Sequence, residues 1–98
     1  MDPAIINKIL EIIVPYKPKS IAVFGSYARG DHNENSDIDI AVDYRRGITL
    51  FDICDMLHDL KEALGVKVDL VDIRGAKPYF LKNIEADLKF IYESQETV

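Results

Sequence analysis

Hydrophobic residues recur at helical spacing in two long stretches of the chain. The first, residues 3–13, follows Asp2, a residue type that caps helix N-termini. The second, residues 50–64, lies between Thr49, another capping residue, and Gly65, a residue type that commonly ends helices. The apolar positions are Ile5, Ile6, Ile9, Leu10 and Ile13 in the first stretch and Leu50, Ile53, Leu57, Leu60 and Leu64 in the second. Both stretches are predicted to be amphipathic helices with one face in the core.

Shorter apolar runs between the helices predict strands. The clearest is residues 37–44, where isoleucine and valine alternate with aspartate and alanine, as in a strand with one buried face. Further strands are predicted over residues 20–24, 66–73 and 88–92, and shorter helical segments over residues 26–30 and 78–86. The resulting order, α-β-α-β-α-β-α-β, predicts an α/β (α+β) fold. In it, a small mixed sheet of about four strands is flanked by helices.

Length and composition favour one small domain. The 98 residues, 48% of them hydrophobic, are predicted to form a single domain over residues 1–98. No apolar run approaches the ~18 residues of a membrane span, and no basic N-terminal region precedes an apolar stretch, so a cytoplasmic protein is expected. The single cysteine, Cys54, cannot form an internal disulfide and is expected to be a small core residue.

The formal net charge of −5 limits the classes of partner. Proteins that bind nucleic acid in general usually carry a basic face, because neutralising phosphates supplies most of their affinity. The acidic balance therefore argues against general nucleic-acid binding. It is typical of a protein that gathers carboxylates around a metal ion, or of one that pairs with a basic partner.

The strand over residues 37–44 carries a pair of carboxylates. Asp37 and Asp39 are two residues apart, so both side chains leave the same face of the strand. Two such carboxylates repel each other unless a cation lies between them, and Mg²⁺ prefers oxygen ligands of this kind. Asp43 shares the face further along and is expected to face solvent. The pair therefore predicts a site for a divalent metal ion.

A third carboxylate from a later strand would complete a site for two ions. Asp69 and Asp72 are the candidates, and they face opposite sides of their strand. Asp69 is preferred because strand residues flank it on both sides, whereas Asp72 lies near the end of the run. Asp72 stays open as the alternative.

A glycine-serine pair follows the first predicted strand. Gly25 lacks a side chain, so a phosphate group can approach the backbone closely, and the hydroxyl of Ser26 can donate to a phosphate oxygen. The N–H groups at the start of the following helical turn add further donors. Arg29 either binds the same phosphates or forms an ion pair with Asp31, and the sequence leaves both open.

Gly25-Ser26 followed at this spacing by Asp37-Ile38-Asp39 resembles the signature of the DNA polymerase β-like nucleotidyltransferase superfamily. The fuller run from Gly25 to Gly30, with Ser36 before Asp37, resembles its minimal nucleotidyltransferase (MNT) branch. The resemblance implies the nucleotidyltransferase fold, and that Gly25 and Ser26 hold the triphosphate of ATP. It also implies that two Mg²⁺ ions are bound by Asp37, Asp39 and a third acidic residue, whose position Asp69 matches.

The resemblance also implies a biological role. MNT proteins are commonly the antitoxin half of a toxin–antitoxin pair whose other half is a helical HEPN protein. They neutralise the toxin by transferring AMP to one of its tyrosines, by forming a complex with it, or by both. An active transferase and an antitoxin that acts by binding alone, with a vestigial site, are therefore both open. So is transfer to RNA or to a small molecule, and an edge strand would allow a homodimer or a hetero-oligomer.

Overall fold

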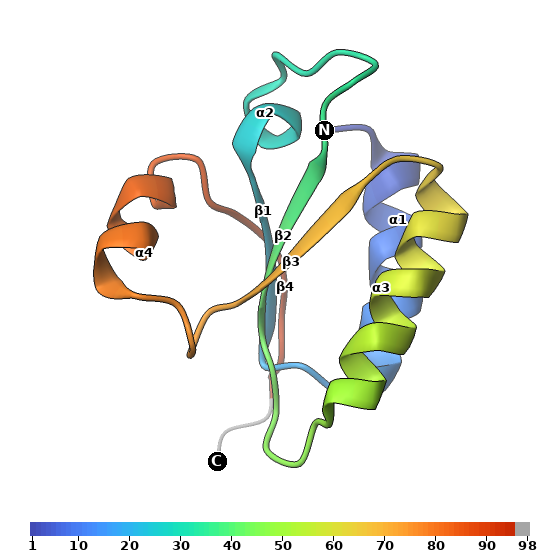
Figure 1. Ribbon diagram of the computed structural model, residues 1–98, viewed down its shortest axis with the longest axis vertical. Coiled ribbons are helices and arrows are strands. Elements are labelled where there is room, and N and C mark those ends of the chain that lie inside the picture. Colours follow the sequence, from blue (N-terminus) through green and yellow to red (C-terminus); the bar gives the residue numbers. More distant parts are fainter. Residues whose placement is uncertain (96–98) are drawn as a thin grey trace.

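The computed structural model describes residues 1–95 and has one four-stranded sheet at its centre (Figure 1). The strands are β1 (Ser20–Phe24), β2 (Ile38–Asp43), β3 (Val68–Asp72) and β4 (Lys89–Glu93). They lie in the order β3-β2-β1-β4, with β1 antiparallel to both of its neighbours and β3 parallel to β2. The predicted mixed sheet of four strands is therefore confirmed.

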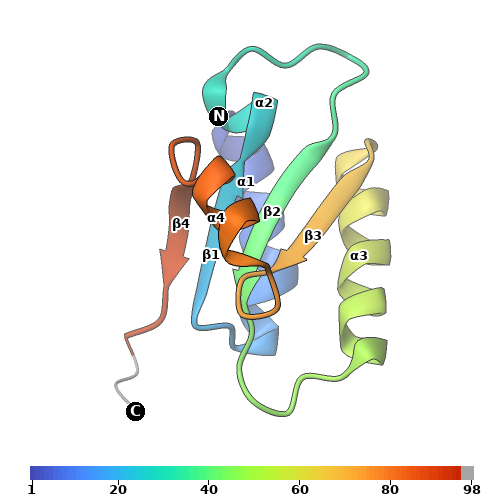
Figure 2. The same ribbon diagram turned by 60° about the vertical axis from the view of Figure 1, so that its left-hand side comes forward.

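Helices lie on both faces of this sheet. They are α1 (Pro3–Ile13), η1 (Val14–Tyr16), α2 (Gly25–Arg29), α3 (Leu50–Leu64) and α4 (Pro78–Ile84). Figures 1 and 2 show α1 and α3 side by side on one face, α4 on the other, and α2 at the end of β1. Every predicted element is present in the predicted order. The predicted domain also includes residues 96–98, which lie outside the described residues.

The two faces of the sheet have cores of different size. On the face that α1 and α3 cover, Ile38, Ile40 and Val42 of β2 are almost completely buried in the main core. On the opposite face, Ala41 of β2 joins a small cluster with Phe24, against which Phe80 and Ile84 of α4 pack. This second face is only partly covered, and it is the face that carries Asp39.

Local signals at the helix ends act as the sequence predicts. The Asp2 carboxylate accepts a hydrogen bond of 2.9 Å from the backbone N–H of Ala4 at the start of α1. Thr49 and Asp52 exchange side-chain and backbone hydrogen bonds, both 3.1 Å, in a capping box at the start of α3. Across residues 1–95, every helix is too short or too polar to cross a lipid bilayer.

The first turn of α3 differs from the prediction. Leu50, expected on the buried face, is 78% exposed, and Cys54, expected in the core, is also exposed. The fully buried residues of this helix are Met56 and Leu60, in later turns. Because the helix packs through these later turns, its N-terminal turn lies outside the core, which periodicity alone could not reveal.

Candidate active site

Two of the predicted carboxylates lie side by side on the partly covered face of the sheet. The register of the strands pairs Asp39 of β2 with Asp69 of β3 on one side and with Phe24 of β1 on the other. Residues paired across neighbouring strands point to the same face, so the two carboxylates are adjacent. Asp37 lies one residue before β2 begins. The parallel pairing of β2 and β3 thus brings together residues 30 positions apart in the sequence.

The electrostatics of Asp39 reflect this crowding. Its pKa is raised from 3.8 to about 6, first by burial, then by the negative charge of Asp69 and a hydrogen bond with it, and further by the charge of Asp37. The positive charge of Arg29 lowers it only in part. All three predicted carboxylates therefore belong to one electrostatic cluster whose negative charge is incompletely balanced.

Gly25 lies against this cluster. Its φ of 75° is in the left-handed region, which glycine adopts without strain. A Cβ atom built at this position would collide with the carboxylate of Asp39, and would lie 3.2 Å from its Cγ atom. Glycine is thus required here twice, by the backbone conformation and by the close approach of the carboxylate. Gly25 and Asp39, which belong to the two halves of the sequence motif, thus lie against each other.

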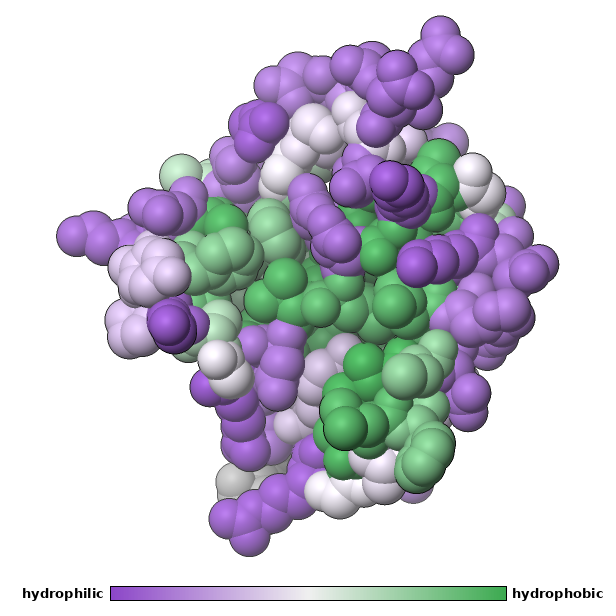
Figure 3. Space-filling model, viewed as in Figure 1, coloured by the Kyte–Doolittle hydropathy of each residue, from purple (hydrophilic) through white to green (hydrophobic). Residues whose placement is uncertain are grey.

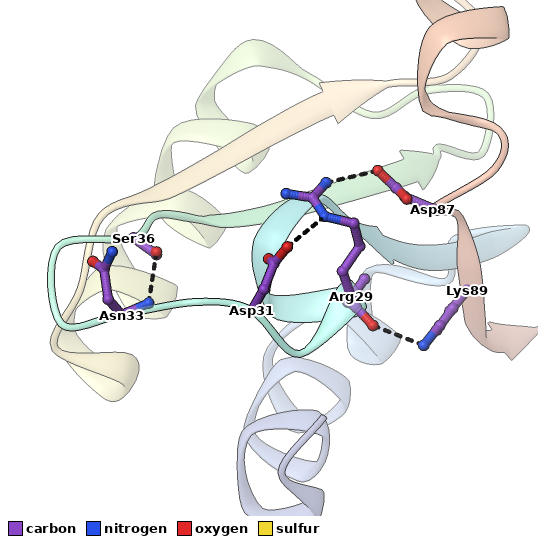
Figure 4. Close-up of polar contacts among 7 residues, drawn as sticks. Arg29, Asp31, Asn33, Ser36, Asp87 and Lys89 are labelled. Atoms are coloured by element: carbon purple, nitrogen blue, oxygen red, sulfur yellow. Dashed lines mark hydrogen bonds and ion pairs between the residues drawn. The ribbon is translucent and has the colours of Figure 1, made fainter.

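The short helix α2 holds Gly25 and Ser26 in place. Its residues Tyr27 and Ala28 are buried, and Gly30 ends the helix with a φ of 86°. The ammonium group of Lys89 in β4 donates a hydrogen bond of 2.7 Å to the backbone carbonyl of Ala28 (Figure 4). This contact ties α2 to an edge strand. Ser26, half-buried, therefore stands on an anchored turn at the end of β1.

Arg29 forms the ion pair that the sequence left open, and a second one. Its Nε atom lies 3.1 Å from the Asp31 carboxylate, and its Nη1 atom lies 2.8 Å from that of Asp87, which precedes β4 (Figure 4). Both carboxylates raise the pKa of the guanidinium. Sequence reasoning missed Asp87 because it lies 58 residues away in the chain. Arg29 nevertheless acts on Asp39 through its charge.

The loop that leads into β2 has its own structure. The backbone N–H of Asn33 donates to the hydroxyl of Ser36 at 2.9 Å, and the N–H of Ser36 donates back to the Asn33 carbonyl at 3.0 Å (Figure 4). The ring of His32 stacks on that of Tyr27 in α2, with centroids 3.9 Å apart. These contacts connect the loop to α2 just before Asp37, and the sequence did not reveal them.

The other candidate carboxylates lie elsewhere. Asp72 is paired with Val42 and so points to the face that α1 and α3 cover, away from Asp39. Its carboxylate accepts a hydrogen bond of 3.0 Å from the backbone N–H of Arg74. Asp43 shares the face of Asp39 but lies at the far end of β2, where it pairs with Arg74 at 3.4 Å. Of the two candidates on β3, the structure places Asp69 beside Asp39.

A divalent cation is compatible with these residues. Among residues 1–95, no three acidic, histidine or cysteine side chains converge closely enough to enclose a metal ion. Mg²⁺ needs no such cage, because one or two carboxylates, substrate phosphates and water usually hold it. Asp39 and Asp69 supply that pair, and the Asp39 carboxylate lies directly against the backbone of Gly25. The donor set therefore fits a cation bound together with a phosphorylated substrate.

Comparison with known proteins finds a family and relatives that match most of the chain. The sequence profile of the family described as polymerase beta, nucleotidyltransferase matches residues 7–97. The chain is 48% identical over 77 residues to MJ1217 of Methanocaldococcus jannaschii, an alignment that covers 78% of this chain and 79% of that protein. It is 36% identical over 94 residues to the protein adenylyltransferase MntA of Shewanella oneidensis, covering 92% of this chain and 66% of MntA.

Solved structures share the same architecture. One chain of a toxin–antitoxin crystal structure with AMP-PNP superposes with a TM-score of 0.79 at 34% identity, covering 92% of this chain and 74% of that one. A chain from the complex of the tri-AMPylated Shewanella oneidensis HEPN toxin with its MNT antitoxin superposes with a TM-score of 0.75 at 30% identity. That match covers 97% of this chain and 75% of the other.

The small mixed sheet with helices on both faces is the fold of the nucleotidyltransferase class of enzymes. The chain belongs to the polymerase beta nucleotidyltransferase family, as the family match over residues 7–97 shows.

Proposed function

We propose that this chain is a Mg²⁺-dependent protein adenylyltransferase that acts as an antitoxin, transferring AMP from ATP to a tyrosine of a HEPN-domain toxin. The observation that carries the proposal is the contact of Gly25 with the Asp39 carboxylate, which itself lies beside Asp69. A phosphate group and a divalent cation can meet there.

The relatives support the choice of acceptor. The MntA proteins of Shewanella oneidensis and Thermococcus cleftensis are both protein adenylyltransferases, 36% and 34% identical to this chain. A structural neighbour is an MNT antitoxin in complex with a HEPN toxin that carries three AMP groups. Transfer to a protein, and to a HEPN protein in particular, is the acceptor chemistry that these matches favour.

Each site residue has a distinct role in the proposed reaction. Asp39 and Asp69, with Asp37 nearby, would hold the cation, and Gly25 lets the triphosphate approach the backbone while Ser26 donates to it. The cation would neutralise phosphate charge and favour ionisation of the acceptor hydroxyl. The tyrosine oxygen bonds to the α-phosphorus, the bond to the β-phosphate oxygen breaks, and pyrophosphate leaves. The fixed positions of the carboxylates on a sheet orient the two reactants.

A transfer assay tests this proposal. The chain is incubated with α-³²P-ATP, Mg²⁺ and a HEPN-domain protein from the same organism, and label on the HEPN protein is measured. Asp39→Asn removes a charge from the cluster, and Asp43→Asn is the matched control on the same face of the same strand. We expect label with the wild-type chain and with Asp43→Asn, and none with Asp39→Asn. Mass spectrometry of the labelled protein then locates the modified side chain.

The same assay separates the alternative modes of action. Absence of label, together with a stable complex of the two proteins in gel filtration, would favour an antitoxin that acts by binding alone. Label on RNA or on a small molecule, with none on any HEPN protein, would move the acceptor to another class.

A further inference from the structure

A cavity of about 690 Å³ opens at the end of the sheet opposite to α2. Four segments line it: the α1–β1 and β2–α3 connections, the chain after β3 and the chain after β4. Figures 1 and 2 show these four segments gathered at the same end of the sheet. The basic side chains among its lining residues are Lys17, Lys19, Arg45, Arg46 and Arg74.

The concentration of positive charge there contrasts with the whole chain. The molecule carries a formal charge of −5, yet five of its 12 lysine and arginine residues line this one cavity. Within residues 1–95, the carboxylate that forms an ion pair with this group is Asp43, 3.4 Å from Arg74. The other four cations have no ion-pair partner in that part of the chain. Like charges gathered in one hollow repel each other, and an anion would relieve the repulsion.

The lining indicates which kind of anion fits. Beside the five cations, the lining residues within 1–95 are one proline and one serine. These residues offer no aromatic ring on which a base could stack, so recognition would depend on charge and on the guanidinium groups. A single phosphate would contact few of the five cations in a cavity of this size. A chain of linked phosphates could contact several.

This cavity is separate from the carboxylate cluster. Asp43, at the cavity end of β2, is four residues from Asp39, or about 13 Å along the strand at roughly 3.3 Å per residue. The carboxylate cluster repels anions unless a cation is bound there, whereas the basic cavity needs none. Binding at the two places can thus be distinguished by removing divalent ions.

Lys17 has an unusual backbone conformation at the rim of the cavity. Its φ is 58°, in the left-handed region that a lysine adopts less easily than glycine. The turn is closed by a hydrogen bond of 2.8 Å from its N–H to the Val14 carbonyl. Replacing Lys17 with glycine would therefore remove the charge without straining the turn.

We propose that this basic cavity binds a ligand that carries several linked phosphate groups, independently of the carboxylate site. The source is a free oligophosphate or the backbone of a nucleic-acid strand, which share the same chemistry. This binding site goes beyond the proposed transferase activity and does not depend on it.

Isothermal titration calorimetry of the full chain tests the proposal. The probes are tripolyphosphate and a short single-stranded oligothymidine, each in EDTA so that no cation supports binding at the carboxylates. The variant is Lys17→Gly/Arg46→Gln, with Lys61→Gln on α3 as the matched control for loss of one exposed charge. We expect the double variant to bind at least about tenfold more weakly, the scale of one lost charged hydrogen bond. Lys61→Gln should change affinity by less than about twofold.

The outcomes separate the sources. Binding of tripolyphosphate alone supports the proposal with a free oligophosphate as ligand, and binding of the oligonucleotide supports it with a nucleic-acid strand. Binding of neither probe overturns the proposal, as does binding that the double variant leaves undiminished. Thermal melting verifies that the double variant is folded. If it is not, Arg46→Gln alone, at an exposed loop position, is measured instead.

Discussion

The two faces of β2 differ in what they do for the molecule. One face presents Ile38, Ile40 and Val42, all buried under α1 and α3. The other presents Asp39 beside Asp69, with only the small helix α4 covering part of the surface further along. Neighbouring residues of one strand thus belong either to the hydrophobic core or to the carboxylate cluster. The buried face allows the opposite face to keep carboxylates whose mutual repulsion destabilises the fold.

The largest effect is expected from breaking the buried face. Ile40→Ala removes a fully buried side chain and leaves a cavity, so the free energy of unfolding should fall by about 2–5 kcal/mol. Urea denaturation followed by circular dichroism measures this. Transfer per folded molecule should stay near that of the wild type, since Ile40 points away from the carboxylates. A selective loss of activity in folded protein would contradict the division of the faces.

The partly covered face of the sheet, which carries Asp39, is tested by a pair of substitutions on β3. Asp69→Asn should lower the transfer rate by about 10²–10³-fold, the scale for losing one group that stabilises transition-state charge. Asp72→Asn, three residues on and pointing to the other face, should leave the rate nearly unchanged. Single-turnover kinetics at saturating ATP measure both rates. Equal losses of transfer rate in the two variants would show that the face of β3 on which an aspartate lies does not determine its part in transfer.

Two glycines with similar backbone angles allow the effect of backbone strain to be distinguished from the effect of contact with the Asp39 carboxylate. Gly25→Ala and Gly65→Ala both place a Cβ on a residue with φ near 70°, at 75° and 69°, and each should lose about 1–2 kcal/mol of stability. The new Cβ meets the Asp39 carboxylate at Gly25 but no atom within 4 Å at Gly65. The transfer rate should therefore fall only in Gly25→Ala. The expected fall is about tenfold, which corresponds to a rise of about 1.4 kcal/mol in the activation free energy when the carboxylate is displaced. Similar transfer rates in the two variants would show that the close approach of Gly25 to the Asp39 carboxylate is not needed for transfer.

The smallest effect concerns pH. The pKa of Asp39 is about 6 in the folded chain, whereas the ordinary value for this carboxyl is 3.8, so folding favours the protonated form. Stability from this group is complete below about pH 4 and is lost as the pH rises through about 6. Without divalent ions, the melting temperature should fall by a few degrees between about pH 4 and about pH 6. Asp39→Asn should flatten the dependence of the melting temperature on pH. An equally steep dependence in that variant would show that other titrating groups cause it.

Much of the fold could be predicted because its signals are local. Asp2, Thr49 and Gly65 set helix ends through contacts with residues two to four positions away. The alternation around Asp39 identified the face of the strand from sequence alone. Asp69 was preferred over Asp72 as the third carboxylate, but the parallel pairing of β2 with β3 that puts it beside Asp39 was not predicted, because strand order depends on how the whole chain packs. The same holds for Asp87, which pairs with Arg29 from 58 residues away.

Two surface features did not follow from the sequence. The net charge of −5 argued against the basic face of a general nucleic-acid binder, yet Lys17, Arg46 and Arg74 come from three separate segments to line one cavity. Periodicity placed Leu50 on the buried face of α3, but it is 78% exposed, and Phe51 beside it is 83% exposed. Figure 3 shows hydrophobic atoms gathered over this first turn of α3. Both features depend on which segments come together in space.

The pairing of β2 with β3 also limits how the length of this chain can change during evolution. Side chains alternate along a strand, so deleting one residue within β3 before Asp69 would turn its carboxylate toward the apolar core. The site would be lost even though every motif residue remained in the sequence. The loop over residues 31–36 lies outside the sheet, so this alternation does not apply to it. Descendants of this sequence should therefore conserve the length of β3.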